Sequence, residues 1–207
     1  MKRRLKRLGL LALAVGLVSA AAASSAAAKT VTKTATFNQC VDANSGILDN
    51  STAYASVFVN VPKNGKKIQS GTVRTVNSAA VRITHTYSGD LDLVLVSPAG
   101  QVAALATERG QGDDGYGIGA TGCTGSLVQF SDAFATPIAD VSNSGDPITG
   151  AFKPEQPLST FVGGPARGFW TLAVADCCGD DVGALNAFSL SFTYSYKKPA
   201  KKKKGGK

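Results

Sequence analysis

The stretch VRITHTYSGDLDLVLVSPAG, from Val81 to Gly100, predicts two consecutive β-strands joined by a turn. In residues 81–87, apolar or aromatic side chains alternate with polar ones, which is the period of a strand with one buried and one solvated face. Residues 88–90, Ser-Gly-Asp, are typical of a turn. The alternation restarts in residues 91–97, where both faces are more apolar. We therefore expect a hairpin around which the other strands are arranged.

Short alternating runs recur along the rest of the chain. Those with strand character are residues 55–61, 68–76, 101–107, 126–130, 168–175 and 187–195. The glycine-rich segment 110–122 is expected to be a long loop. Because no helical period of useful length is left after the amino-terminal segment, the sequence predicts an all-β fold, an antiparallel sandwich. Trp170 is expected to be buried in its core.

Four motifs follow one another in a specific order. The first is H-x-x-x-G-D-L-x-L-x-L-x-S-P-x-G, from His85 to Gly100. The others, starting at residues 158, 168 and 181, are L-S-x-F-x-G, G-x-W-T-L-x-V-x-D and D-x-G-x-L-N-x-F-S-L-x-F. Together they resemble the P domain (Homo B domain), the companion module of proprotein convertases and of several bacterial secreted proteases. Phe188 stands where this family usually has Trp, and the cysteines are additions to the family pattern.

This resemblance implies an antiparallel jelly-roll β-sandwich of the galactose-binding-like kind, with catalysis in a separate protease domain that we do not expect in this chain. The residues agree, because a serine protease mechanism needs a nucleophile, a base and an orienting acid, and the chain has one histidine. No H-E-x-x-H, G-x-S-x-G or G-T-S-x-A string is present. We therefore expect His85 to be a structural residue of the core and the protein not to be an enzyme.

The two ends of the chain differ in composition from its middle. Residues 1–28 have a basic start, an apolar run and an Ala-rich end, which predicts a secretory signal peptide and a secreted, extracellular protein. A membrane anchor is the alternative, but the apolar run, residues 8–18, is shorter than the roughly 20 residues a spanning helix needs. We expect residues 29–46 to be a linker or edge segment and residues 47–196 to be the P domain.

The formal net charge of +8 comes from the ends. Between residues 29 and 196, ten basic residues stand against fourteen acidic ones, so the folded part is mildly acidic. Residues 197–207, KKPAKKKKGGK, are expected to be a disordered tail. Its run of Lys201, Lys202, Lys203 and Lys204 is expected to contact polyanions, with no specific nucleic acid, or else only to keep the protein soluble.

Four cysteines, Cys40, Cys123, Cys177 and Cys178, predict two disulfides rather than a metal site in an exported chain. Adjacent residues of an extended strand point to opposite sides, so a bond between Cys177 and Cys178 would need a strained turn. We therefore expect Cys40 and Cys123 each to pair with one of the two adjacent cysteines. The sequence does not decide which.

Four carboxylates, those of Asp90, Asp176, Asp180 and Asp181, follow predicted strands or lie in predicted turns. A sandwich can bring them to one end, and calcium takes six to eight oxygen ligands from such loops. The alternative is that these residues cap turns by binding local amides. Calcium is therefore one of two hypotheses for this group.

Two functions follow from these observations. The first is a secreted, non-catalytic P-domain protein that stabilises or docks onto a protease or another exported partner. The alternative is an extracellular module that binds glycans through the jelly roll or anionic envelope polymers through the lysine tail.

Overall fold

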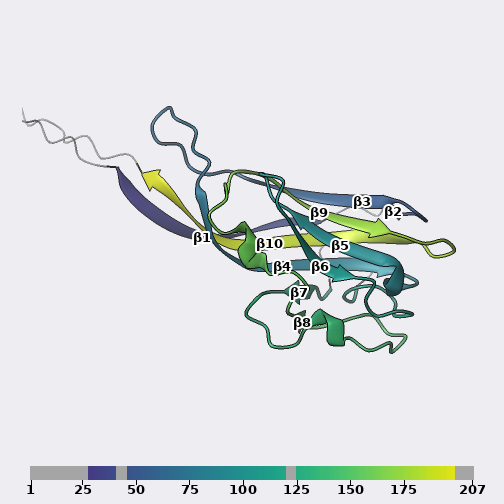
Figure 1. Cartoon of the computed structure of the whole chain (residues 1–207). Helices are drawn as coiled ribbons and strands as arrows, with labels where there is room; N and C mark the ends of the chain where they lie inside the picture. The colour runs from purple at the N-terminus through teal and green to yellow at the C-terminus, as the bar shows by residue number, and fades with distance from the viewer. Residues whose placement is uncertain (1–27, 41–45, 120–124, 199–207) are drawn as a thin grey trace, which may run out of the picture.

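The computed structural model describes residues 28–40, 46–119 and 125–198, and these residues form a sandwich of two β-sheets (Figure 1). One sheet, sheet A, has the strand order β1-β10-β4-β7-β8, with β2 also paired to β10. The other, sheet B, has the order β3-β9-β5-β6. The strands of sheet A are β1 (Lys29–Cys40), β2 (Gly46–Ile47), β4 (Thr72–His85), β7 (Val128–Phe130), β8 (Ala151–Phe152) and β10 (Gly183–Lys198). Those of sheet B are β3 (Thr52–Val59), β5 (Leu91–Val96), β6 (Val102–Thr107) and β9 (Gly168–Asp176).

The pairing is antiparallel throughout, except that β7 and β8 run parallel. The helical elements of the described residues are three short 3₁₀ turns, η1 (Ser88–Asp90), η2 (Ile138–Asp140) and η3 (Leu158–Phe161). In this part of the chain no helix has the length and apolar character that crossing a membrane requires. The predicted all-β sandwich is confirmed.

The two strands of the opening stretch belong to different sheets. β4 lies in sheet A between β10 and β7, whereas β5 lies in sheet B between β9 and β6. The expected hairpin is therefore wrong: η1 carries the chain across the sandwich and does not turn it back. Ser88 anchors this crossing, because its buried hydroxyl donates to the carbonyl of Asp113 at 2.8 Å and accepts from the N–H of Gly115 at 2.8 Å.

The core lies between the facing sides of the two sheets. In β5 the three leucines are fully buried, while Asp92, Val94 and Val96 between them are half-buried on the outer face. Trp170, on β9, has no exposed surface and its ring centroid lies 5.2 Å from that of Phe161 and 5.4 Å from that of Phe192, on β10. Its indole N–H donates to the carbonyl of Ala166 at 3.0 Å, so the polar atom of the ring is satisfied.

β1 and β10 pair along the whole of β1, from Lys29 opposite Lys198 to Cys40 opposite Ala187. Their far ends project from the sandwich as a two-stranded ribbon (Figure 1). The pairing carries β10 to Lys198, so the strand includes the first two lysines of the segment expected to be a tail. A regular strand continues there because β1 offers it a complete partner edge.

Replacing Trp170 tests the core. Trp170→Ala should lower the free energy of unfolding by about 3–5 kcal/mol, because it deletes a buried ring and leaves a cavity between the sheets. Phe169→Ala is a matched control, since the neighbouring ring is 62% exposed and its loss should cost less than about 1.5 kcal/mol. Urea unfolding followed by far-ultraviolet circular dichroism measures both, and equal losses would contradict the assignment of faces in β9.

Candidate functional site

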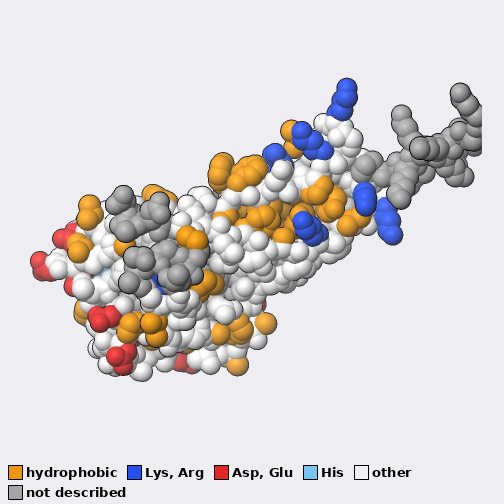
Figure 2. All heavy atoms as spheres, turned by 180° about the vertical axis from the view of Figure 1, so that it is seen from behind, with side chains coloured by type: hydrophobic (Ala, Val, Ile, Leu, Met, Phe, Trp, Pro, Cys, Tyr) orange, Lys and Arg blue, Asp and Glu red, His pale blue; other side chains and the backbone are white. Residues whose placement is uncertain are grey.

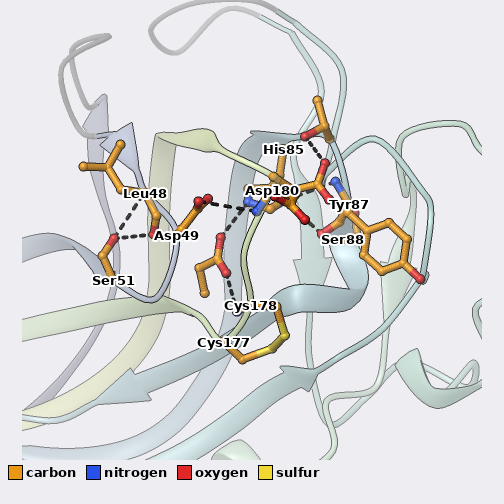
Figure 3. A network of polar contacts seen from close by, with 12 residues as sticks. Leu48, Asp49, Ser51, His85, Tyr87, Ser88, Cys177, Cys178 and Asp180 are labelled. Atoms are coloured by element: carbon orange, nitrogen blue, oxygen red, sulfur yellow. Dashed lines mark hydrogen bonds and ion pairs between the residues drawn. A yellow bond between two sulfur atoms is a disulfide. The ribbon is translucent and has the colours of Figure 1, made fainter.

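Several polar residues of the sequence analysis meet at one end of the sandwich, which we call the rim: residues 48–51, 85–90 and 176–181. β4 ends there at His85 and β9 ends there at Asp176, so the antiparallel layers bring the two strand ends together. The backbone closes the rim as well, because the N–H of Asp176 donates to the carbonyl of Ser51 at 2.8 Å and that of Cys177 to the carbonyl of Asp90 at 3.0 Å. Figure 3 shows how these side chains lie.

His85 and Asp176 form a buried pair at the centre of the rim. The Nε2 atom of His85 lies 3.1 Å from Oδ2 of Asp176, and both side chains are fully buried. Its Nδ1 atom lies 2.9 Å from the carbonyl oxygen and 3.2 Å from the backbone nitrogen of Tyr87. The other oxygen of Asp176 accepts from the N–H of Cys178 at 2.8 Å. Every polar atom of the pair therefore has a partner in the fold.

The hydrogen bonds of this pair stabilise the rim and leave no free ring nitrogen for acid–base catalysis. A general base needs a free nitrogen within reach of the proton it takes, and both ring nitrogens of His85 are engaged. Among the described residues, no serine, threonine or cysteine side chain hydrogen-bonds to the ring. The nearby hydroxyl of Ser88 is buried and already bonded to Asp113 and Gly115. The pair supplies neither a nucleophile nor an open acid or base.

The disulfide at the rim differs from the expected pairing. Cys177 and Cys178 are bonded to each other, with their Cα atoms 3.8 Å apart, so the expected bonds from Cys40 and Cys123 to this pair are wrong. The expectation assumed an extended backbone, but β9 ends at Asp176 and the two cysteines lie in the irregular segment that follows it. Cys40 is itself disulfide-bonded. Cys123 lies outside the described residues.

The four carboxylates of the calcium hypothesis lie at the rim, but they do not converge. Asp181 accepts from the hydroxyl of Thr86 at 2.6 Å, and the N–H of Asp180 points to a carboxylate oxygen of Asp49 at 3.4 Å. Among the described residues, the acidic or sulfur ligands that gather within 4.8 Å of one another are those of Asp90, Cys177 and Cys178. Since these two sulfurs are bonded to each other, they are not thiolate ligands. The donor set does not fit a calcium ion as it stands, and calcium binding stays a prediction.

The carboxyl of Asp90 lies close to other negative charges at the rim. Partial burial, followed by the charges of Asp176 and Asp181, raises the pKa of its carboxyl above the ordinary value. The carboxyl of Asp90 is therefore protonated more readily than that of an exposed aspartate. A perturbed pKa can mark a functional site, but here its causes are the packing of the rim and its surplus of carboxylates.

Sequence reasoning missed the outer face of sheet B. Tyr54 and Phe58 on β3 and Phe169 on β9 are 62%, 43% and 62% exposed, although β3 alternates them with buried Ala and Val residues. The rings of Phe58 and Phe169 contact each other edge to face, with centroids 5.0 Å apart. The Arg167 guanidinium lies 5.3 Å from the centre of the Phe58 ring. The signal was present in the sequence, because aromatic residues occupy the solvated positions of a strand.

The remaining predicted residues fall in two groups. Trp170 lies in the core, as described above, on the opposite face of β9 from Phe169. Lys201, Lys202, Lys203 and Lys204 lie outside the described residues, as do residues 1–27 of the predicted signal peptide.

Comparison with known proteins gives one family and a group of solved structures. The proprotein convertase P-domain family matches residues 74–192. The crystal structure of an Aeromonas sobria serine protease matches with 18% sequence identity and a TM-score of 0.48, covering 84% of this chain and 28% of that one. The complex of an Aeromonas sobria serine protease with a chaperone matches with 17% identity and a TM-score of 0.48, covering 80% and 27%. The chain spans little more than a quarter of the length of these proteases. No curated protein matches it.

The structural role of the buried pair can be tested by a double-variant cycle. His85→Ala should lower the free energy of unfolding by about 3–5 kcal/mol, because it leaves the carboxylate of Asp176 buried without its partner. His85→Ala combined with Asp176→Ala should cost clearly less than the sum of the two single changes. Urea unfolding measures the cycle. Additive costs would show that the two side chains do not stabilise each other.

The crowded rim also predicts a pH dependence. The raised pKa of Asp90 means that its charge destabilises the fold above that pKa, and that stability is recovered as the pH falls through it. Asp90→Asn should therefore stabilise the protein at pH 7 by up to about 1 kcal/mol. The gain should vanish below the ordinary aspartate pKa of about 3.9. Thermal unfolding across this range measures it, with exposed Asp114→Asn as the control, and a loss of stability at pH 7 would refute it.

Proposed function

The chain belongs to the proprotein convertase P-domain family, and on this basis we propose that it is a secreted, non-catalytic module that docks onto or stabilises an exported protease. The rim supports the non-catalytic part, because its histidine and aspartate are consumed by structural bonds. Two observations support export: the signal-like residues 1–28, and disulfide-bonded cysteines, which persist in oxidising compartments.

The observation that carries the docking proposal is the aromatic face, which we define as Tyr54, Phe58 and Phe169 on the outer side of sheet B. Half-buried Val94 and Val96 and exposed Val102 continue it across β5 and β6. Exposed apolar side chains gathered on one face mark interaction sites in soluble proteins. Aromatic rings in particular supply much of the binding energy at protein interfaces.

The aromatic face is also built to be rigid. Its residues stand on paired strands of a sandwich, with Phe58 directly opposite Phe169 in the register of β3 and β9. Two residue pairs further along the same strands, on the same outer face, the hydroxyls of Ser56 and Thr171 are 2.7 Å apart. Rings held by a rigid scaffold lose little conformational entropy on binding, which favours affinity. A protease surface with apolar side chains would bury these rings.

The second candidate is glycan binding by the same face. The specific observation that favours it is the pair of hydroxyls, Ser56 and Thr171, beside exposed aromatic rings. A sugar presents apolar C–H faces that pack on aromatic rings and hydroxyls that hydrogen-bond to polar groups. The aromatic face offers both kinds of contact.

Affinity capture from the culture medium of the source organism tests the docking proposal. The immobilised mature chain should retain a protein that cleaves casein after elution, whereas the purified chain itself should cleave none. Tyr54→Ser with Phe169→Ser should reduce retention at least tenfold, the effect of removing one or two interface anchors worth about 2 kcal/mol. Thermal unfolding of the free variant should show that the fold persists.

Ile118→Ser is the matched control, because this side chain is 57% exposed but lies on the glycine-rich loop. It should retain the partner as well as the wild type does. Retention that survives the double change would place docking elsewhere. Binding of immobilised glycans that the double change abolishes would favour the second candidate.

A further inference from the structure

Charge is segregated along the molecule. Lysine and arginine side chains gather at the end with the projecting ribbon, and acidic side chains gather at the opposite end (Figure 2). We call this the basic end, defined by its cations Lys29, Lys33, Lys63, Lys66, Lys67, Arg74, Arg167, Lys197 and Lys198. All of them are exposed except Arg167, which is half-buried. The segments that carry them, residues 28–40, 60–75, 163–170 and 189–198, contain no aspartate or glutamate.

Contacts between distant segments assemble the basic end. The amide of Gln69 donates to the carbonyl of Lys197 at 2.8 Å and accepts from its N–H at 2.9 Å, which ties the β3–β4 loop to the ribbon. The N–H of Arg167 donates to the carbonyl of Ser70 at 2.7 Å, which adds the start of β9. Cations from four parts of the sequence are thus held on one surface.

The loop presents its lysines on a tight turn. Asn64 and Lys67 exchange backbone hydrogen bonds of 2.9 and 3.1 Å, and Gly65 between them has a φ of +62°. This is the geometry of a two-residue hairpin turn with glycine at its first central position, which type II′ turns favour. The backbone of this turn is therefore hydrogen-bonded in a defined geometry, which fixes the positions of Lys63, Lys66 and Lys67.

A groove runs between this loop and the ribbon. It has a volume of about 370 Å³ and is lined by the cations Lys67, Arg74 and Lys197 and by the hydroxyl residues Thr30, Ser70 and Ser195, among others. The Nε atom of Arg74 donates to the hydroxyl of Ser195 at 2.8 Å, which orients the guanidinium. Neither ion pair found among the described residues involves a cation of the basic end. The positive charge of the groove is thus not neutralised by carboxylates of the fold.

We propose that the basic end is a binding site for a linear anionic polysaccharide, formed by the folded domain itself and distinct from the lysine run 201–204. The folded part has a net negative charge, but salt screens charges beyond about 8 Å at physiological ionic strength. A polyanion at the groove therefore experiences the local cations and little of the acidic end. Guanidinium and ammonium groups bind sulfate or carboxylate groups, and the groove hydroxyls can bind sugar hydroxyls.

A nucleic acid fits this groove less well. Proteins that bind single strands stack the bases on exposed aromatic rings. The aromatic residue of the groove is Tyr196, whose ring is half-buried and lies 6.0 Å from that of Tyr194. The groove offers charge and hydroxyls but no open stacking platform.

Salt-dependent binding of heparin, used as the probe polysaccharide, tests the proposal on the full mature chain. Lys63→Gln, Lys66→Gln and Lys67→Gln together should weaken binding at least tenfold at about 0.1 M salt. By analogy with counterion release from nucleic acids, the triple change should also lower the slope of log affinity against log salt by about 2. The melting temperature of the triple variant should equal that of the wild type, which would show that the weaker binding does not come from a loss of folding.

Two comparisons separate this site from a general charge effect and from the tail. Lys66→Gln should weaken binding more than Lys153→Gln, a control that removes the same charge from an exposed position outside the basic end. Equal effects would overturn the proposal. So would a triple variant that binds like wild type while replacement of Lys201, Lys202, Lys203 and Lys204 by Gln abolishes binding. Tighter binding of single-stranded DNA than of heparin would overturn the choice of ligand.

Discussion

The packing of Trp170 against Phe192 across the two sheets is the contact on which the other features of this protein depend. Trp170 is central to sheet B and Phe192 to sheet A, so their contact fixes the spacing and the relative position of the layers. With that spacing set, alternate side chains of β3, β5 and β9 must point outward. The aromatic face exists because the inner positions of these strands are already filled.

Burial at the rim explains the structural role of a histidine beside an aspartate here. A catalytic pair needs one open nitrogen and a nucleophile, whereas His85 and Asp176 satisfy each other and the backbone ends of two strands. Removing one member would leave a buried charge unpaired, which is costly in the low-dielectric interior. These two residues therefore serve to join β4 of one sheet to β9 of the other.

The two binding proposals rest on two different outer surfaces. The aromatic face is apolar and rigid and fits a protein or a sugar ring, whereas the basic end is polar and fits a polyanion. Arg167 lies where the two meet, because its guanidinium covers Phe58 while its backbone binds the β3–β4 loop. If both proposals hold, this P-domain protein holds a partner through one surface and remains near an anionic matrix through the other.

The sequence by itself determined the all-β class, most of the strands and the buried side of strands such as β5 and β9, because alternation with a period of two is a local property of the chain. It did not predict β2 or β8, and it divided β4 into two strands. Only the tertiary structure decided which strands are neighbours, and it replaced the expected hairpin by a crossing between sheets at Ser88. It also decided that Cys177 bonds to Cys178, since the backbone leaves the extended conformation after Asp176. Likewise, residues 29–196 are mildly acidic in sum, yet folding gathers most of their cations at the basic end. These outcomes depend on backbone turns and on contacts between distant segments, which no local pattern records.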